Sequence, residues 1–308
     1  MAVINTIASK SAGCGGGAIN TGDLGCDISF GLVIHALGFA KGTVISKNVE
    51  LTLPLIEALI QKGDIIPLMD AFSSEPTMSE DTLETSPLGV EALTLKGLPK
   101  YALTMKKGQE YYKQMAKLTG FGNINYVLGD VNGNWKFAID GNGDFTGFTA
   151  GQTLAAITTP ATATETEKKT FTFQLTDRTQ IDSTYAVIEA ANAFPISNIT
   201  GVNGLQFSFA DANGLVIPTT GDTTLKVKAV LASDRITDIE GLVLADFNTS
   251  AGTISAVSDT GNGFYTLTVT ALTAGLLTVQ TKDATLGTDV ILNSNVLFKS
   301  SVLSATVA

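Results

Sequence analysis

The stretch Gly261-Asn-Gly-Phe-Tyr-Thr-Leu-Thr-Val-Thr270 decides the fold that we expect for the C-terminal part of the chain. Its Tyr, Leu and Val residues alternate with threonines, which is typical of a strand with one buried face. The Asn262-Gly263 pair is a signal for a hairpin turn. Similar runs recur at the spacing of a β-sandwich, at residues 224–231, 241–247, 252–258, 263–270, 275–281 and 289–299. We therefore place a domain boundary at Thr219–Asp222 and predict a sandwich over residues 223–308.

The preceding residues, 26–222, predict a second β-rich domain, either a sandwich or barrel-like, with one or two short helices. In residues 53–63 the apolar side chains fall on one helical face, Pro54 suits a first turn and Gly63 suits a C-cap. Residues 108–118 predict another amphipathic helix, and its apolar face consists of Tyr111, Met115 and Leu118. The chain as a whole is thus expected to be mainly β.

Two glycine-containing acidic segments lie between apolar runs, Asp130-Val-Asn-Gly-Asn134 and Asp140-Gly-Asn-Gly-Asp144. Both begin like an EF-hand calcium loop, which also needs Gly at its sixth position and Glu at its twelfth. Counted from Asp130 or Asp140, those positions hold Trp135 and Gly141, or Phe145 and Gly151. We interpret both segments as hairpin turns, with a weak calcium site as the alternative, and expect no metal and no cofactor.

Residues that carry catalytic chemistry are scarce in the sequence. Residues 1–25 are rich in small side chains and predict a flexible or partner-ordered arm, and the sequence leaves open whether Cys14 and Cys26 pair. His35, the single histidine, lies in the apolar run 32–37, which favours a satisfied, partly buried ring over a ligand or a base. We expect the protein not to be an enzyme.

The composition is poor in charge and the net charge is negative. Charged residues make up 16% of the 308 residues and hydrophobic residues 44%, against about 25% charged in a typical domain. Such a chain hides much surface, in large cores or in subunit interfaces. A net charge of −10 argues against sequence-specific or general nucleic-acid binding. The negative charge is what we expect of a subunit with an acidic lumen through which DNA passes. The alternative is that the negative charge simply maintains solubility. We expect no membrane insertion, because apolar runs are too short.

Two neighbouring segments carry opposite charge. The acidic stretch, residues 70–91, holds six carboxylates and no Lys or Arg, and it predicts an exposed loop or the tip of a long hairpin. The basic stretch, residues 96–117, holds six lysines against Glu110 alone. We predict that the two stretches form a head-to-tail interface between subunits, although they can also attract each other within one chain. The interface residues that we predict are Glu75, Glu80, Asp81, Glu84, Lys106, Lys107 and Lys113.

Two parts of the chain resemble known proteins. The runs 242–247, 252–257, 261–270 and 275–280 resemble bacterial Ig-like domains of the invasin and intimin kind, which implies an Ig-like sandwich. The segments Lys96-Gly-Leu-Pro-Lys100, 107–112 and 145–151, together with Phe173-Gln-Leu-Thr-Asp-Arg178, look like structural proteins of tailed phages. The layout of the two domains is similar to siphophage tail tube proteins.

The resemblance implies a structural virion protein that assembles with copies of itself into rings or a tail tube. It also implies contacts with other virion proteins, assembly in the host cytoplasm and location in the virion. Two alternatives stay open: a capsid decoration or head-fibre protein, and an adhesin whose Ig-like domain binds a surface ligand.

Overall fold

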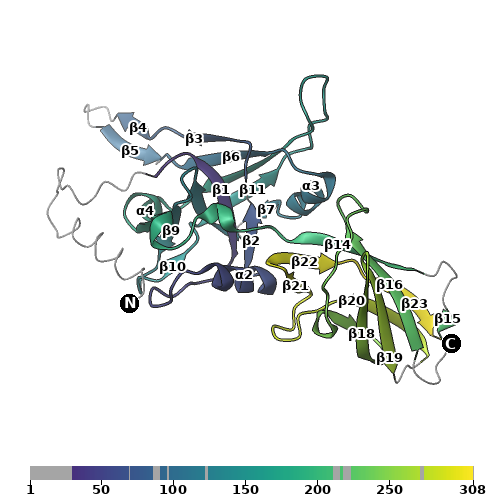
Figure 1. The fold of residues 1–308 in the computed structure, drawn as a ribbon. Helices are drawn as coiled ribbons and strands as arrows, with labels where there is room; N and C mark the ends of the chain where they lie inside the picture. The colour runs from purple at the N-terminus through teal and green to yellow at the C-terminus, as the bar shows by residue number, and fades with distance from the viewer. Residues whose placement is uncertain are drawn as a thin grey trace. The chain divides into compact units, whose positions relative to one another are not determined.

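The structure, a computed structural model, is mainly β and divides after Ile199 into two units (Figure 1). It describes residues 30–68, 70–85, 91–95, 97–121, 124–210, 216–217, 223–270 and 274–307. The predicted N-terminal arm, residues 1–25, lies outside these residues, as do Cys26 and the predicted boundary segment 219–222. The prediction of a mainly β chain with few short helices is confirmed.

The first sheet of unit 1 has the order β10-β9-β8-β1-β2, and β13 pairs with β9 as well. Its strands are β1 (Val33–Ala40), β2 (Ile65–Leu68), β8 (Ile124–Asp130), β9 (Trp135–Ile139), β10 (Phe145–Thr146) and β13 (Tyr185–Ile188). β1 is buried along most of its length, as its central place in the sheet requires.

The second sheet of unit 1 has the order β3-β6-β12-β11-β7. Its strands are β3 (Ser73–Met78), β6 (Pro99–Met105), β7 (Gly120–Phe121), β11 (Ala150–Ala155) and β12 (Lys169–Leu175). Phe171, Phe173 and Leu175 alternate with polar residues and share one core with Tyr126 of the first sheet. The Tyr126 and Phe173 rings stack at 4.1 Å. Unit 1 is therefore a sandwich whose sheets pack through these alternating side chains.

Helices α2 (Leu53–Lys62) and α3 (Gln109–Ala116) confirm the two helices expected from the sequence. Pro54 lies in the first turn of α2, and Gly63 ends it at a φ of 83°. That left-handed conformation favours glycine, because a side chain there would clash with the backbone. The short helix α4 (Arg178–Asp182) is capped by Asp177, whose carboxylate accepts from Thr179 N.

The two acidic segments are hairpin turns, as predicted. The Asp130 carboxylate accepts from the backbone N of Asn132 and Asn134 at 2.9 and 2.8 Å. The Asp140 carboxylate accepts from Asn142 and Asp144 in the same way. Each aspartate thus uses its oxygens to hold the backbone of its own turn.

His35 is buried, as expected, and its Nδ1 accepts a hydrogen bond from Asp70 N at 3.1 Å. Burial lowers the pKa of the ring, although the carboxylates of Asp70 and Asp130 oppose that effect. The ring therefore favours its neutral form.

Unit 2 is a sandwich with the strand arrangement of an Ig domain. One sheet has the order β18-β19-β16-β14-β22-β21, and the other has β15-β23-β20-β17. Across the first sheet, β14, β16, β19 and β18 hold the places of strands A, B, E and D, while β17, β20 and β23 hold those of C, F and G across the second. The β21–β22 hairpin is an addition at the edge beside β14. The strands are β14 (Asn203–Phe209), β15 (Val216–Ile217), β16 (Thr223–Leu231), β17 (Phe247–Thr249), β18 (Thr253–Gly261), β19 (Phe264–Thr270), β20 (Gly275–Thr281), β21 (Val290–Asn293), β22 (Val296–Ser300) and β23 (Leu303–Val307).

The predicted domain boundary is wrong. β14 lies before it, yet it pairs with β16 and β22, and Leu205 and Phe207 belong to the core of unit 2. The division after Ile199 puts this strand with its partners.

Two strand predictions in unit 2 also need correction. Most of residues 241–247 is not strand, because Asp246 caps a short 3₁₀ helix by accepting from Val243 N at 2.8 Å. Residues 289–299 are two strands joined at Ser294 and Asn295, which both have positive φ. Such a two-residue reversal is a hairpin turn.

Candidate assembly surface

The acidic stretch forms one arm of a long hairpin. β3 pairs with β6 from Ser73↔Thr104 to Met78↔Pro99, and beyond them β4 (Thr82–Thr85) pairs with β5 (Glu91–Leu95). β4 and β5 form a two-stranded sheet of their own, which extends past the sandwich (Figure 1). The hairpin alternative is confirmed, and a loop through the whole of 70–91 is wrong. We call β4 and β5 the hairpin arm.

The start of the acidic stretch is held by its own chain. Asp70 Oδ2 lies 3.2 Å from Lys107 Nζ. Lys106 Nζ lies 3.4 Å from the centre of the Phe72 ring, a cation–π contact on a side chain that is 65% exposed. The acidic stretch is therefore anchored to its own domain, because β3 is also a full member of the sheet.

The structure separates the predicted acidic residues into three groups. Glu75 on β3 and Glu80 beyond its end are exposed. Asp81 forms an ion pair with Arg178, which no interface prediction included. Glu84 lies on β4, and its side chain is outside the described part of the structure.

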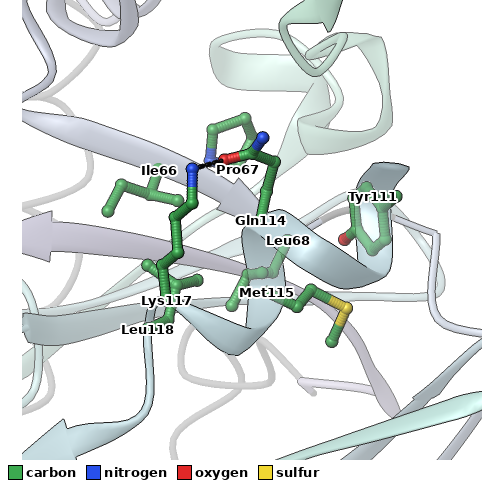
Figure 2. Close-up of a pocket in the computed structure, with 8 residues that line it drawn as sticks. All are labelled: Ile66, Pro67, Leu68, Tyr111, Gln114, Met115, Lys117 and Leu118. Carbon is green, nitrogen blue, oxygen red and sulfur yellow. Dashed lines mark hydrogen bonds between the residues drawn. The ribbon is translucent and has the colours of Figure 1, made fainter. Parts of the chain in front are cut away.

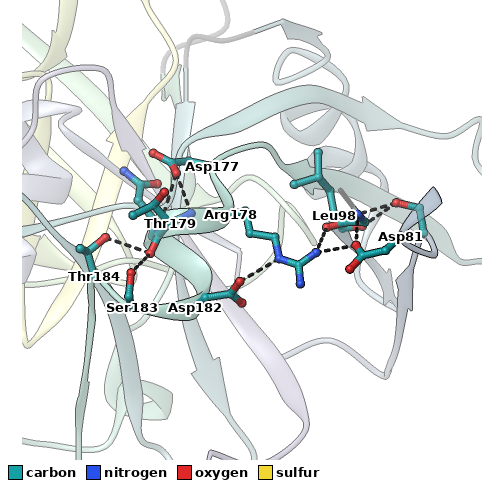
Figure 3. Close-up of polar contacts among 11 residues, drawn as sticks. Asp81, Leu98, Asp177, Arg178, Thr179, Asp182, Ser183 and Thr184 are labelled. Atoms are coloured by element: carbon teal, nitrogen blue, oxygen red, sulfur yellow. Dashed lines mark hydrogen bonds and ion pairs between the residues drawn. The ribbon is translucent and has the colours of Figure 1, made fainter. Parts of the chain in front are cut away.

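Arg178 is the functional candidate that sequence reasoning missed. Its Nη1 lies 2.6 Å from Asp81 Oδ1, and its Nε lies 2.8 Å from Asp182 Oδ2 (Figure 3). The spacing of Arg178 and Asp182 by four residues on a helix was a usable signal for the second pair. The pairing with Asp81, 97 residues away, leaves no local pattern in the sequence.

The basic residues gather around α3. Lys107 precedes the helix and Lys113 lies on its exposed side. Tyr112 fixes the helix to the sheet, because its buried hydroxyl donates to Met105 O at the end of β6, at 3.2 Å, and accepts from Lys107 N.

A small apolar hollow lies between β2 and α3. It has a volume of about 250 Å³, below the roughly 300–1,000 Å³ of small-molecule sites. Lys117 Nζ donates to Gln114 Oε1 at its rim (Figure 2). The lining residues are Ile66, Pro67, Leu68, Tyr111, Gln114, Met115, Lys117 and Leu118. The predicted apolar face of α3 thus lines a space suited to a single side chain.

Tyr111 contributes an unusual polar atom beside this hollow. Its hydroxyl is buried and has no hydrogen-bond partner among the described residues. Burial raises the pKa of the phenol, and the charge of Asp70 adds to that effect. The hydroxyl therefore stays protonated and keeps an unused donor.

Helix α3, which lines the hollow, and the hairpin arm lie at opposite ends of β6 (Figure 1). β6 ends at Met105 and leads into α3, whereas the arm continues from Met78. A strand of six residues spans roughly 20 Å. The exposed Glu80, beside the arm, and the exposed Lys113, on α3, are therefore displayed at two ends of one unit.

Comparisons with known proteins give no family for this chain. No family model and no curated protein matches it. Among solved structures it is similar to the SGBP-B protein of the Bacteroides ovatus mixed-linkage glucan utilization locus, in complex with a mixed-linkage heptasaccharide. Identity is 13%, coverage is 79% of this chain and 62% of that chain, and the TM-score is 0.20. The chain thus spans less than two thirds of that protein, and so low a TM-score supports no inference about fold or ligand.

In the described part of the chain, no helix has the length and apolar character needed to cross a bilayer.

Proposed function

We propose that this chain is a structural virion protein of a tailed phage that assembles with copies of itself into rings or a tail tube. The observation that carries the proposal is the hairpin arm, which leaves the sandwich as an isolated pair of strands. A two-stranded hairpin alone in water is at best marginally stable. A neighbouring subunit that packs against the arm would supply the missing contacts.

In this proposal, β3 and the residues that lead from it into the hairpin arm meet the α3 end of the next copy, which would place the arm beside that neighbour. Glu75 and Glu80 would approach Lys113 and Lys117, and Met78, which is 60% exposed, would enter the apolar hollow. Methionine adapts well to irregular apolar spaces. A contact between different ends of the same molecule is heterologous, and it repeats into a ring or a filament.

Two prolines favour this contact over the addition of a strand at a sheet edge. Pro67 lies in the edge strand β2, and Pro76 lies in the edge strand β3. Proline lacks the N–H that a new neighbouring strand would need, and natural edge strands use it to prevent such pairing.

The experiment is electron microscopy of the purified full chain, together with light scattering, at low and at physiological salt. Rings, stacked rings or tubes are expected, and they should form less readily as ionic strength rises, because exposed charge pairs are screened. A chain that stays monomeric at every concentration and salt would overturn the proposal.

A further inference from the structure

The hairpin changes its bonding where the arm leaves the sandwich. The β3–β6 ladder ends at Met78↔Pro99, and the β4–β5 ladder begins at Thr82↔Leu95. Between them, side chains replace part of the backbone ladder. Leu98 N donates to Ser79 Oγ at 2.9 Å, and Gly97 N donates to Asp81 Oδ1. We call residues 79–81 with Gly97 and Leu98 the hinge.

Glycine is required at one point of this hinge. A Cβ on Gly97 would lie 1.9 Å from Ser79 O, far inside van der Waals contact. The two strands therefore approach more closely here than any residue with a side chain would allow. The hinge is consequently a defined crossing of two strands.

Arg178 bonds to both strands at this crossing. Nη1 donates to Asp81 Oδ1 at 2.6 Å and approaches Gly97 O at 3.3 Å. Nε donates at the same time to Asp182, one turn further along α4. The guanidinium thus links a helix of the sandwich to each strand of the hinge (Figure 3).

We infer that Arg178 is a positioning residue that fixes the direction of the hairpin arm relative to the sandwich of unit 1. The planar fork of an arginine can hold Asp182 through Nε while it holds the hinge through Nη1. A lysine offers a single point charge and cannot do both in this geometry. The consequence for assembly rests on the proposed function: an arm held in one direction loses less entropy when it meets a neighbour.

The test is hydrogen exchange of the full chain, unassembled at low concentration, followed in peptides that contain β4 and β5. The variants are Arg178→Gln, Arg178→Lys, Asp81→Asn and the double Asp81→Asn/Arg178→Gln. Asparagine can still accept from Gly97 N, so Asp81→Asn removes the charge and keeps that bond. Arg235→Gln in unit 2 is the matched control.

Exchange in β4 and β5 should be roughly two- to five-fold faster in Arg178→Gln, because an exposed ion pair is worth that much. Arg178→Lys should restore little of the protection, and the double variant should be no faster than Arg178→Gln. β12 and the Arg235→Gln control should be unchanged. Unaltered exchange of β4 and β5 in Arg178→Gln, or full rescue by lysine, would overturn the inference.

Assembly of the same variants is measured separately. Faster exchange with slower assembly supports both the positioning role and the proposed function. Faster exchange in a chain that never assembles supports the positioning role and overturns the proposed function, so the two failures are distinguishable.

Discussion

Asp130 and Asp140 begin turns of the same sequence motif, but the two side chains differ in burial and in the reach of their hydrogen bonds. Asp130 is fully buried, and besides its own turn it accepts from Gly31 N at 2.8 Å. Asp140 holds its own turn near the surface, with backbone bonds from Asn142 and Asp144. The sequence predicted both turns because Asn-Gly and Asp-Gly act locally. It could not predict the long-range bond to Gly31, which depends on tertiary packing.

We expect Asp130→Ala to destabilise the protein by roughly 3 kcal/mol, because several partly buried donors lose their buried acceptor at once. Asp140→Ala is the matched control and should cost clearly less. Urea unfolding of unit 1 measures both changes. Equal losses for the two variants would contradict the assignment of Asp130 as a buried structural residue.

The protein should not depend on calcium. The carboxylate oxygens of Asp130 and Asp140 already accept from backbone donors of their turns, and an EF-hand would turn such oxygens toward the ion. Addition of a chelator should therefore leave the Tm unchanged. A Tm that rises with added calcium and falls with chelator would restore the calcium alternative.

His35 should make stability sensitive to mild acid. Burial lowers the pKa of the folded ring below its ordinary value of 6.5, so the unfolded chain takes up a proton first as the pH falls. The stabilising contribution of the neutral ring is complete above pH 6.5 and is lost as the pH falls through the lowered pKa. The Tm between pH 7.5 and pH 5 should fall less steeply in His35→Gln than in the natural chain. Parallel slopes would exclude His35 as the cause.

At the scale of elements, hydrophobic periodicity and turn residues allow individual helices and strands to be predicted, because both signals are local in the sequence. α2 was predictable because Pro54 and Gly63 mark its two ends, and β12 because Phe171, Phe173 and Leu175 alternate. β14 also alternates between buried and more exposed residues, but its partners β16 and β22 are distant in the sequence. No local pattern says to which sheet a strand belongs, and the boundary was misplaced for that reason.

The corrected boundary makes a direct prediction about fragments. Residues 200–308 should fold alone as a cooperative β-sandwich, because they hold every described strand of both sheets of unit 2. Residues 223–308 lack β14, which lies between β16 and β22, and lose the buried Leu205 and Phe207. Loss of two large core side chains alone costs several kcal/mol, comparable to the whole stability of a small domain.

Circular dichroism and denaturant unfolding of the two fragments measure this difference. The longer fragment should show a cooperative transition, and the shorter one should be largely unfolded or aggregated. A shorter fragment with equal stability would show that β14 is dispensable and that the first boundary was adequate.

At the scale of the whole molecule, the charge pattern of the sequence indicated the two candidate surfaces, but it did not indicate with which residues their charged side chains pair. The opposite signs of the two stretches are visible in the sequence, and both surfaces are present in unit 1. Asp70 and Lys107 nevertheless pair with each other within the chain, and Asp81 pairs with Arg178. Ion pairs of this kind depend on which strand ends come together, so composition cannot assign them. The hollow beside α3 likewise arises from packing between β2 and the helix.

The contact that we propose between copies can be tested at carboxylates of the hairpin other than Asp70 and Asp81, which form ion pairs within the chain. Glu75 and Glu80 are exposed on the hairpin, whereas Asp81 acts within the chain and must be left intact. Glu75→Lys/Glu80→Lys should raise the concentration needed for assembly by roughly tenfold, because each reversal replaces an attraction by a repulsion of similar size. Light scattering against concentration measures the change, and the salt dependence of assembly should become weaker or change sign.

Glu50→Lys, at an exposed site before α2, controls for net charge and should assemble normally. Lys113→Glu/Lys117→Glu, added to the hairpin variant, should restore assembly in part, since the electrostatic complementarity of the two ends is then re-formed with opposite sign. Normal assembly of the folded hairpin variant at low salt would place the contact between copies elsewhere on the molecule.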